Sequence, residues 1–161
     1  MTPGWGPNAC IRIYISPVDI DRYSLRGFDC TCGNLRMAAR AVSAVYDRHL
    51  REAGLQASQM AVLWAVAGFG QAPVKDIAAR IVMDETSLLR NLRVLEGRGW
   101  VVLEVGQDRR QRLASLTSEG REVFARALPL WKRAQDDIAN VLDGKLKDIN
   151  RELLRLTRAL G

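Results

Sequence analysis

The stretch MDETSLLRNLRVLE, residues 83–96, decides the fold. Asp84 is of a type that caps helices, and it precedes a segment that we expect to be helical over residues 85–98. Leucines recur there at helical spacing on one face, namely Leu88, Leu89, Leu92 and Leu95. The other face is polar and carries Thr86, Ser87, Arg90 and Arg93, with Asn91 at its edge. The pattern predicts a helix with buried leucines and exposed arginines.

The segments on either side predict a second short helix and a hairpin. A connection over residues 68–73 leads into a helix with Pro73 in its first turn. Its apolar residues should face inward, namely Val74, Ile77, Ala78, Ile81 and Val82. After the leucine helix, residues 100–105 and 112–116 are rich in strand-forming residues. The tip between these two predicted strands reads GQDRR, residues 106–110, and is polar and basic.

Long helices are predicted toward both ends of the chain. One covers residues 32–53, and the next, capped by Ser58, is apolar nearly all round and should be the buried centre of the domain. Another long helix begins at Thr117 and breaks at Gly144. The last helix carries one apolar stripe, Leu146, Ile149, Leu153, Leu156 and Leu160. The first and last stripes are longer than one small domain needs, which favours packing against a partner chain over a core role.

Two tandem helices followed by a basic hairpin suit the reading of double-stranded DNA. A helix fits the major groove, where Arg90 and Arg93 can bind guanine and Asn91 can bind adenine. Thr86 and Ser87 suit phosphate or thymine methyl contacts. Arginines at a hairpin tip can enter the minor groove. The alternative is that these arginines belong to an ordinary solvated helix face.

The composition agrees with a DNA partner and leaves little room for catalysis. The 161 residues carry 24 Lys and Arg against 18 Asp and Glu, a net charge of +6 that favours an anionic partner. With a single histidine, His49, no zinc-protease motif or serine–histidine–acid set can form. We therefore expect no enzyme activity, no metal site and no cofactor. Sparse cysteines, no secretory signal and no membrane-length apolar run predict a soluble cytoplasmic protein.

The sequence resembles the multiple-antibiotic-resistance regulators, the MarR family. Residues 83–96 look like the family's recognition helix, and GWV at 99–101 looks like its step from helix to strand. DRR at 108–110, Leu113 and LTSEG at 116–120 look like its wing and the start of its long helix. The resemblance covers residues 30–143 and, in kind, the last helix.

The resemblance implies a mainly α fold, a winged helix-turn-helix core with long N- and C-terminal dimerisation helices. The expected parts are an N-terminal arm or tail (1–27), a dimerisation helix (28–55), the DNA-binding part (56–117), and a long helix with the C-terminal dimerisation helix (118–161). Asp108 would support the wing by pairing with a nearby arginine, and Arg110 would enter the minor groove. The expected DNA contacts are Thr86, Ser87, Arg90, Asn91, Arg93, Arg109, Arg110 and Arg112.

Two kinds of signal are compatible with such a regulator. The family binds aromatic acids, and a cavity for one would be lined by Tyr46, His49, Met60, Trp64 and Trp131, with Arg36 and Arg40 for the carboxylate. These residues could equally be plain core and surface. Alternatively Cys32, with Cys30 nearby, lies close to where hydroperoxide-sensing members carry a reactive thiol, at a helix start whose partial positive charge stabilises a thiolate. The commoner role for such a cysteine is an inert small residue.

We therefore expect a homodimeric transcriptional regulator that binds a pseudo-palindromic operator, a repressor relieved by a small aromatic ligand. One alternative is a thiol-based hydroperoxide-sensing repressor of the same family. The other is a winged-helix protein-interaction module that does not bind DNA.

Overall fold

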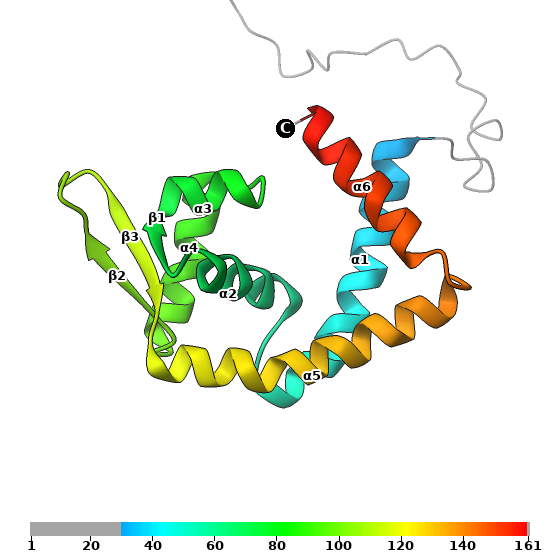
Figure 1. Cartoon of the computed structure of the whole chain (residues 1–161), viewed down its shortest axis with the longest axis horizontal. Helices are drawn as coiled ribbons and strands as arrows, with labels where there is room; N and C mark the ends of the chain where they lie inside the picture. The colour runs from blue at the N-terminus through cyan, green and yellow to red at the C-terminus, as the bar shows by residue number, and fades with distance from the viewer. Residues whose placement is uncertain (1–29, 161) are drawn as a thin grey trace, which may run out of the picture. The chain divides into compact units, whose positions relative to one another are not determined.

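The computed structural model describes residues 30–160, so the predicted arm at residues 1–27 lies outside the described residues. Helices dominate, with a small antiparallel sheet, and this confirms the predicted mainly α winged-helix class (Figure 1). The elements in order are α1 (Thr31–Leu50), the 3₁₀ turn η3 (Arg51–Ala53), α2 (Ala57–Phe69), β1 (Gln71–Pro73), α3 (Val74–Arg80), α4 (Glu85–Gly97), β2 (Val101–Val105), β3 (Arg112–Leu116), α5 (Ser118–Val141) and α6 (Leu146–Leu160).

The core forms where α2, α3, α4 and the sheet meet. Leu88, Leu92 and Leu95 of α4 are fully buried, as the leucine spacing predicts. They join α2, which contributes fully buried Val62, Leu63 and Val66. The predicted central position of α2 is therefore correct for one face of the helix, which holds its five buried residues out of thirteen. Two large side chains of α2 are exposed, Trp64 at 43% and Phe69 at 42%, and Trp64 packs against α5 residues.

Helix α2 begins differently from the prediction. Ser58 is not its cap, because the helix already includes Ala57 and its N-cap is Gln56. The Gln56 backbone N–H donates to Gln59 Oε1 at 3.0 Å, and the Gln56 side chain accepts from the backbone of Gln59, so the two glutamines form a capping box. Asp47 of α1 adds a bond from the Ala57 N–H at 2.7 Å. Gln56, Gln59 and Asp47 therefore satisfy the first N–H groups of this helix, and Ser58 is exposed and takes no part in the cap.

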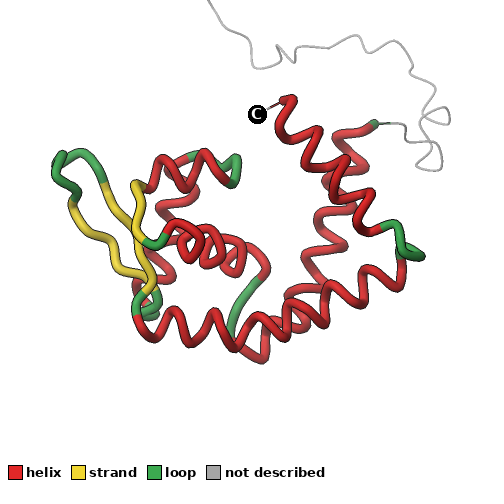
Figure 2. Tube along the Cα trace, viewed as in Figure 1, coloured by secondary structure: helices red, strands yellow, loops and turns green. Residues whose placement is uncertain are grey.

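The connection before α3 contains a strand that the sequence pattern does not predict. Residues 71–73 pair antiparallel with β3, Ala72 opposite Ala114, and the sheet order is β1-β3-β2 (Figure 2). Pro73 is consequently the last strand residue and the N-cap of α3, not a residue of its first turn. The third strand ties the helices to the hairpin.

The turn from α3 to α4 departs from the predicted inward face. Val82 has a φ of 52° and is 61% exposed, although its spacing suggested burial. Helix α3 ends at Arg80, two residues earlier than the pattern implies, so Val82 belongs to the turn and not to the helix. Asp84 then caps α4 as predicted, since Asp84 Oδ1 accepts from the Ser87 N–H at 2.9 Å.

Helix α5 starts at a junction with the sheet. Thr117 caps it by accepting from the Gly120 N–H at 2.9 Å, while its hydroxyl donates to the Gly99 carbonyl at 2.7 Å. Gly120 lies so close to Trp100 that a Cβ on it would overlap the Trp100 carbonyl oxygen. This contact fixes the first turn of α5 against the start of β2. Within residues 30–160, no helix combines the length and the apolar character that a membrane span requires.

We predict that Gly120→Ala lowers the free energy of unfolding by about 1–3 kcal/mol, because the added methyl must displace the Trp100 backbone. Gly97→Ala is the matched control, since Gly97 is helical and nothing lies within 4 Å of its missing Cβ. That variant should gain roughly 0.5–1 kcal/mol. Urea unfolding followed by circular dichroism measures both. Equal stability of Gly120→Ala and the parent would contradict the close packing of this junction.

Candidate nucleic-acid interface

The outward face of α4 carries exposed cations, of which Arg90 lies near enough to the Asp84 carboxylate to help lower its pKa. Arg90 and Arg93 are exposed, opposite the buried leucines, and Thr86 is exposed one turn before Arg90. Among the described residues, neither arginine takes part in an ion pair. Both guanidinium groups are therefore free to bind an anion or a base edge.

The start of α4 is held by its cap. Hydrogen bonds from the Ser87 hydroxyl and backbone lower the pKa of the Asp84 carboxyl, which stays ionised at neutral pH. An anionic cap satisfies the first free N–H groups of the helix and fixes where its first turn begins. Thr86 and Arg90 consequently have a defined place on the surface.

Asn91 is less available than the sequence suggests. It is half-buried, and its Nδ2 donates to the Ser87 carbonyl at 3.0 Å, one turn earlier in α4. Ser87 is half-buried as well. An adenine contact by Asn91 would have to break this bond, so its predicted role stays a prediction.

The hairpin between β2 and β3 presents the predicted basic tip. Figure 2 shows the loop at the end of the hairpin, beyond the paired strands. The loop is closed by bonds from the Gly106 N–H to the Gln111 carbonyl at 3.1 Å and from the Gln111 N–H to the Asp108 carbonyl at 2.8 Å. Arg109 and Arg110 are exposed at its tip, and neither is in an ion pair among residues 30–160.

Asp108 stabilises this loop in a different way from the predicted ion pair. Its Oδ1 accepts from the backbone N–H of Arg110 at 3.0 Å, a bond that shapes the turn. The ion pairs of the described residues include no partner for Asp108. Arg112 instead donates to the Arg109 carbonyl at 3.4 Å. The Asp108 carboxylate thus orders the backbone and leaves the arginine side chains unpaired.

A separate cavity of about 720 Å³ lies among α1, α2, α5 and the end of α3. Four of the predicted residues line it, namely Tyr46, Met60, Trp64 and Trp131. The Trp64 ring packs edge-on against Phe124, with ring centres 5.5 Å apart, and lies 5.0 Å from Trp131. Burial raises the pKa of Tyr46, so its phenol is protonated at neutral pH. The lining is mostly apolar and aromatic, which suits a small organic molecule.

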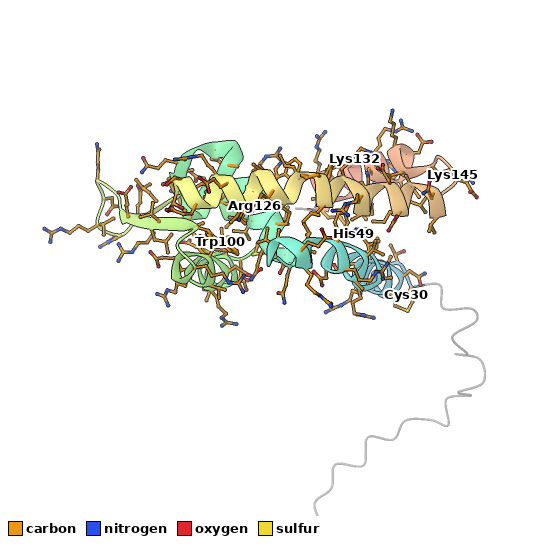
Figure 3. The ribbon with its side chains drawn as sticks, turned by 90° about the horizontal axis from the view of Figure 1, so that it is seen from below. Cys30, His49, Trp100, Arg126, Lys132 and Lys145 are labelled. Carbon is orange, nitrogen blue, oxygen red and sulfur yellow. The ribbon has the colours of Figure 1, made fainter. Side chains whose placement is uncertain are left out.

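The predicted cations are not the ones at this cavity. Its lining does not include Arg36, Arg40 or His49. Arg36 and Arg40 are exposed on α1. His49, labelled in Figure 3, instead contacts Asp137 of α5, Nε2 to Oδ2 at 2.8 Å. The cationic lining residue is Arg80, which has no ion pair among the described residues. In the sequence, the one hint of this position is that Arg80 precedes Ile81, which also lines the cavity.

The two described cysteines lie at the start of α1. Cys30 and Cys32 are exposed and not joined in a disulfide, and the Gly33 N–H donates to Cys30 Sγ at 3.4 Å. Figure 3 labels Cys30 at this helix end. Within residues 30–160, no group of three or more metal-binding side chains comes together.

Comparisons with known proteins agree with this geometry. A sequence model of the MarR family matches residues 53–111. The M. tuberculosis transcriptional regulator MosR in complex with DNA is 33% identical, with a TM-score of 0.75 over 81% of this chain and 96% of that chain. A mutant E. coli MarR with operator DNA shares the fold, at 19% identity and a TM-score of 0.69 over 79% of this chain and 91% of that chain.

A curated relative matches over a shorter stretch. It is YwoH of Bacillus subtilis (strain 168), described as an uncharacterized HTH-type transcriptional regulator. The identity is 28% over 90 residues, which are 56% of this chain. The match spans 66% of the length of YwoH.

We predict that Arg90→Ala weakens specific binding to DNA by about 1–3 kcal/mol, because one base contact is lost. The control is Asn91→Ala, which should cost less than half as much, since the Asn91 amide is already bonded within α4. Fluorescence anisotropy with duplexes from upstream of the protein's own gene measures both affinities. If Arg90→Ala bound as tightly as the parent, the outward face of α4 would not be the reading surface.

Proposed function

The chain belongs to the MarR family of DNA-binding transcriptional regulators, and on this premise we propose that it is a homodimeric repressor of a pseudo-palindromic operator. In this proposal α4 enters the major groove and the β2–β3 wing enters the minor groove. The protein acts in the cytoplasm by binding and not by catalysis. The observation that carries the proposal is the set of exposed, unpaired arginines on α4 and the wing, Arg90, Arg93, Arg109 and Arg110.

The geometry of the two elements supports this assignment of grooves. An α-helix is about 10–12 Å across and fits the major groove, where base edges carry a distinct pattern of donors and acceptors. A two-stranded hairpin tip is thinner, and arginines are drawn into narrow minor grooves by their negative potential. In this proposal α4 supplies sequence recognition, and the wing adds affinity and orientation.

Unpartnered apolar surface supports a homodimer. Every residue of α6 after Leu146 is exposed in the single chain, including Ile149, Leu153 and Leu156 on its apolar stripe. Val42 of α1 is exposed as well. A helix with this pattern gains little from folding unless its stripe is covered. A second copy would cover both stripes and would present two copies of α4 to a two-fold operator.

The wing separates this proposal from a protein-interaction module that does not bind DNA. We predict that the double variant Arg109→Ala, Arg110→Ala reduces the slope of log K against log salt by about 2, about 1 for each lost phosphate contact. The control Lys145→Ala, Lys147→Ala removes the same charge near α6 and should leave the slope unchanged. An unchanged slope in the wing variant would favour the protein-interaction module.

The cavity supports a small aromatic acid as the releasing signal. Trp64, Trp131 and Phe69 offer ring faces, and Arg80 offers a cation for a carboxylate. The Tyr46 hydroxyl makes no hydrogen bond to another described residue, so it is available to a ligand. In this proposal the carboxylate binds Arg80, in place of the originally expected Arg36 and Arg40, and the ring lies among the tryptophans.

We predict that benzoate quenches tryptophan fluorescence of the parent, because Trp64 and Trp131 line the cavity. Arg80→Gln should weaken benzoate binding about fivefold, the upper scale of one ion pair at an exposed side chain. Neutral benzamide is the matched probe, and its affinity should change less than twofold. An equal loss for both probes, or no quenching by benzoate, would contradict the ligand proposal.

The exposed free thiols favour one alternative signal, oxidation by a hydroperoxide at Cys32. Both described cysteines are accessible, and a helix start is a favourable place for a thiolate. Titrating the reduced protein with hydrogen peroxide while following DNA binding distinguishes the two signals. Release of DNA that disappears in Cys32→Ser would establish the redox signal, whereas insensitivity to peroxide favours the ligand.

A further inference from the structure

The turn between α3 and α4 holds a valine in a backbone conformation that usually belongs to glycine. Val82 has a φ of 52°. In this region the Cβ of an L residue crowds the neighbouring carbonyl, at a cost equivalent to roughly a tenfold change in an equilibrium constant. A β-branched side chain is among the least suited to it.

Two backbone hydrogen bonds fix this conformation. The Val82 N–H donates to the Ala79 carbonyl at 3.3 Å, and the Met83 N–H donates to the Ala78 carbonyl at 3.0 Å. These are the two bonds of a Schellman motif, in which glycine commonly occupies the position of Val82. Asp84 follows as the cap of α4. The conformation of Val82 therefore sets the direction in which the chain leaves α3 and enters α4.

The side chain of Val82 does little to offset this strain. It is 61% exposed and does not belong to the buried core. Its neighbours Ile81 and Met83 do pack against the core. The packing of Ile81 and Met83 therefore keeps Val82 in its strained conformation. A displacement of either neighbour would change the turn.

The cavity reaches the residues just before this turn. Arg80 and Ile81, which lie two residues and one residue before Val82, are both in its lining. We propose that Val82 is the positioning residue that connects the cavity to α4: a group pressing on Arg80 and Ile81 lets the strained turn relax, and α4 changes its orientation. This inference rests on the proposed function insofar as α4 reads DNA.

The test replaces Val82 by glycine and fills the cavity by substitution. Glycine adopts a φ of 52° without strain. Val82→Gly therefore keeps the turn but removes the strain energy that favours its relaxation. Ala65→Phe, with Ala61→Phe as a second choice if the first does not fold, places a ring in the cavity. We expect filling to weaken operator binding at least tenfold in the parent and less than twofold in the Val82→Gly background. Equal losses in the two backgrounds, or no loss in either, would overturn the proposal.

Asp143→Gly is the matched control. Asp143 also has a left-handed backbone, with a φ of 45°, but it lies between α5 and α6 and does not line the cavity. In the Asp143→Gly background, filling the cavity should still weaken operator binding at least tenfold. A response lost equally in Asp143→Gly would mean that relief of strain anywhere suffices, which contradicts a specific role for Val82.

A second readout separates this inference from the DNA-binding proposal. Hydrogen exchange of the Met83 amide reports whether its bond to Ala78 is intact. Filling should accelerate this exchange about tenfold in the parent and leave it unchanged in Val82→Gly. If the parent bound no DNA, this result would still support the turn mechanism, and unaltered exchange in both would refute it.

Discussion

Burial of Leu88, Leu92 and Leu95 sets the orientation of α4, and the candidate interface follows from it. Each fully buried leucine contributes about 1.5–3 kcal/mol, so rotating α4 to hide its arginines would forfeit several kcal/mol. The helix therefore presents Arg90 and Arg93 outward without any specific contact to hold them. Because the buried residues of α2 supply the opposing apolar surface, the outward direction of the arginine face depends on this core.

A second constraint relates the wing to α4. Thr117 bonds to Gly99 and to Gly120, which joins the end of α4, the start of β2 and the first turn of α5 at one point. Arg98 adds a bond to the Gly54 carbonyl at 2.7 Å and lies over the Trp100 ring. Helix α4 and the β2–β3 hairpin, which we propose to enter the two grooves, thus extend from one junction that also holds the first turn of α5.

Local patterns predicted the parts of the structure that local chemistry determines. The leucine face of α4, the cap Asp84 and the start of α5 near Thr117 follow from residues within one helical turn of each other. Strand β1 was not predicted because it has three residues and pairs with a segment some forty positions later. Ser58 was mistaken for a cap because glutamine is not among the preferred N-cap residues, and because the bond that Asp47 adds comes from another helix. The left-handed backbone of Val82 could not be predicted, because valine disfavours that conformation. The place of Arg80 at the cavity could not be predicted either, because it depends on how several helices pack together.

The most direct test of the central claim is dimethyl sulfate footprinting on DNA from upstream of the protein's own gene. This reagent methylates guanine N7 in the major groove and adenine N3 in the minor groove. A dimer that reads DNA through α4 should give two patches of protected guanines about one helical turn, 10–10.5 base pairs, or a multiple apart, flanked by protected adenines where the wings lie. A single patch, or protection of adenines without guanines, would contradict a two-fold dimer that reads DNA through α4.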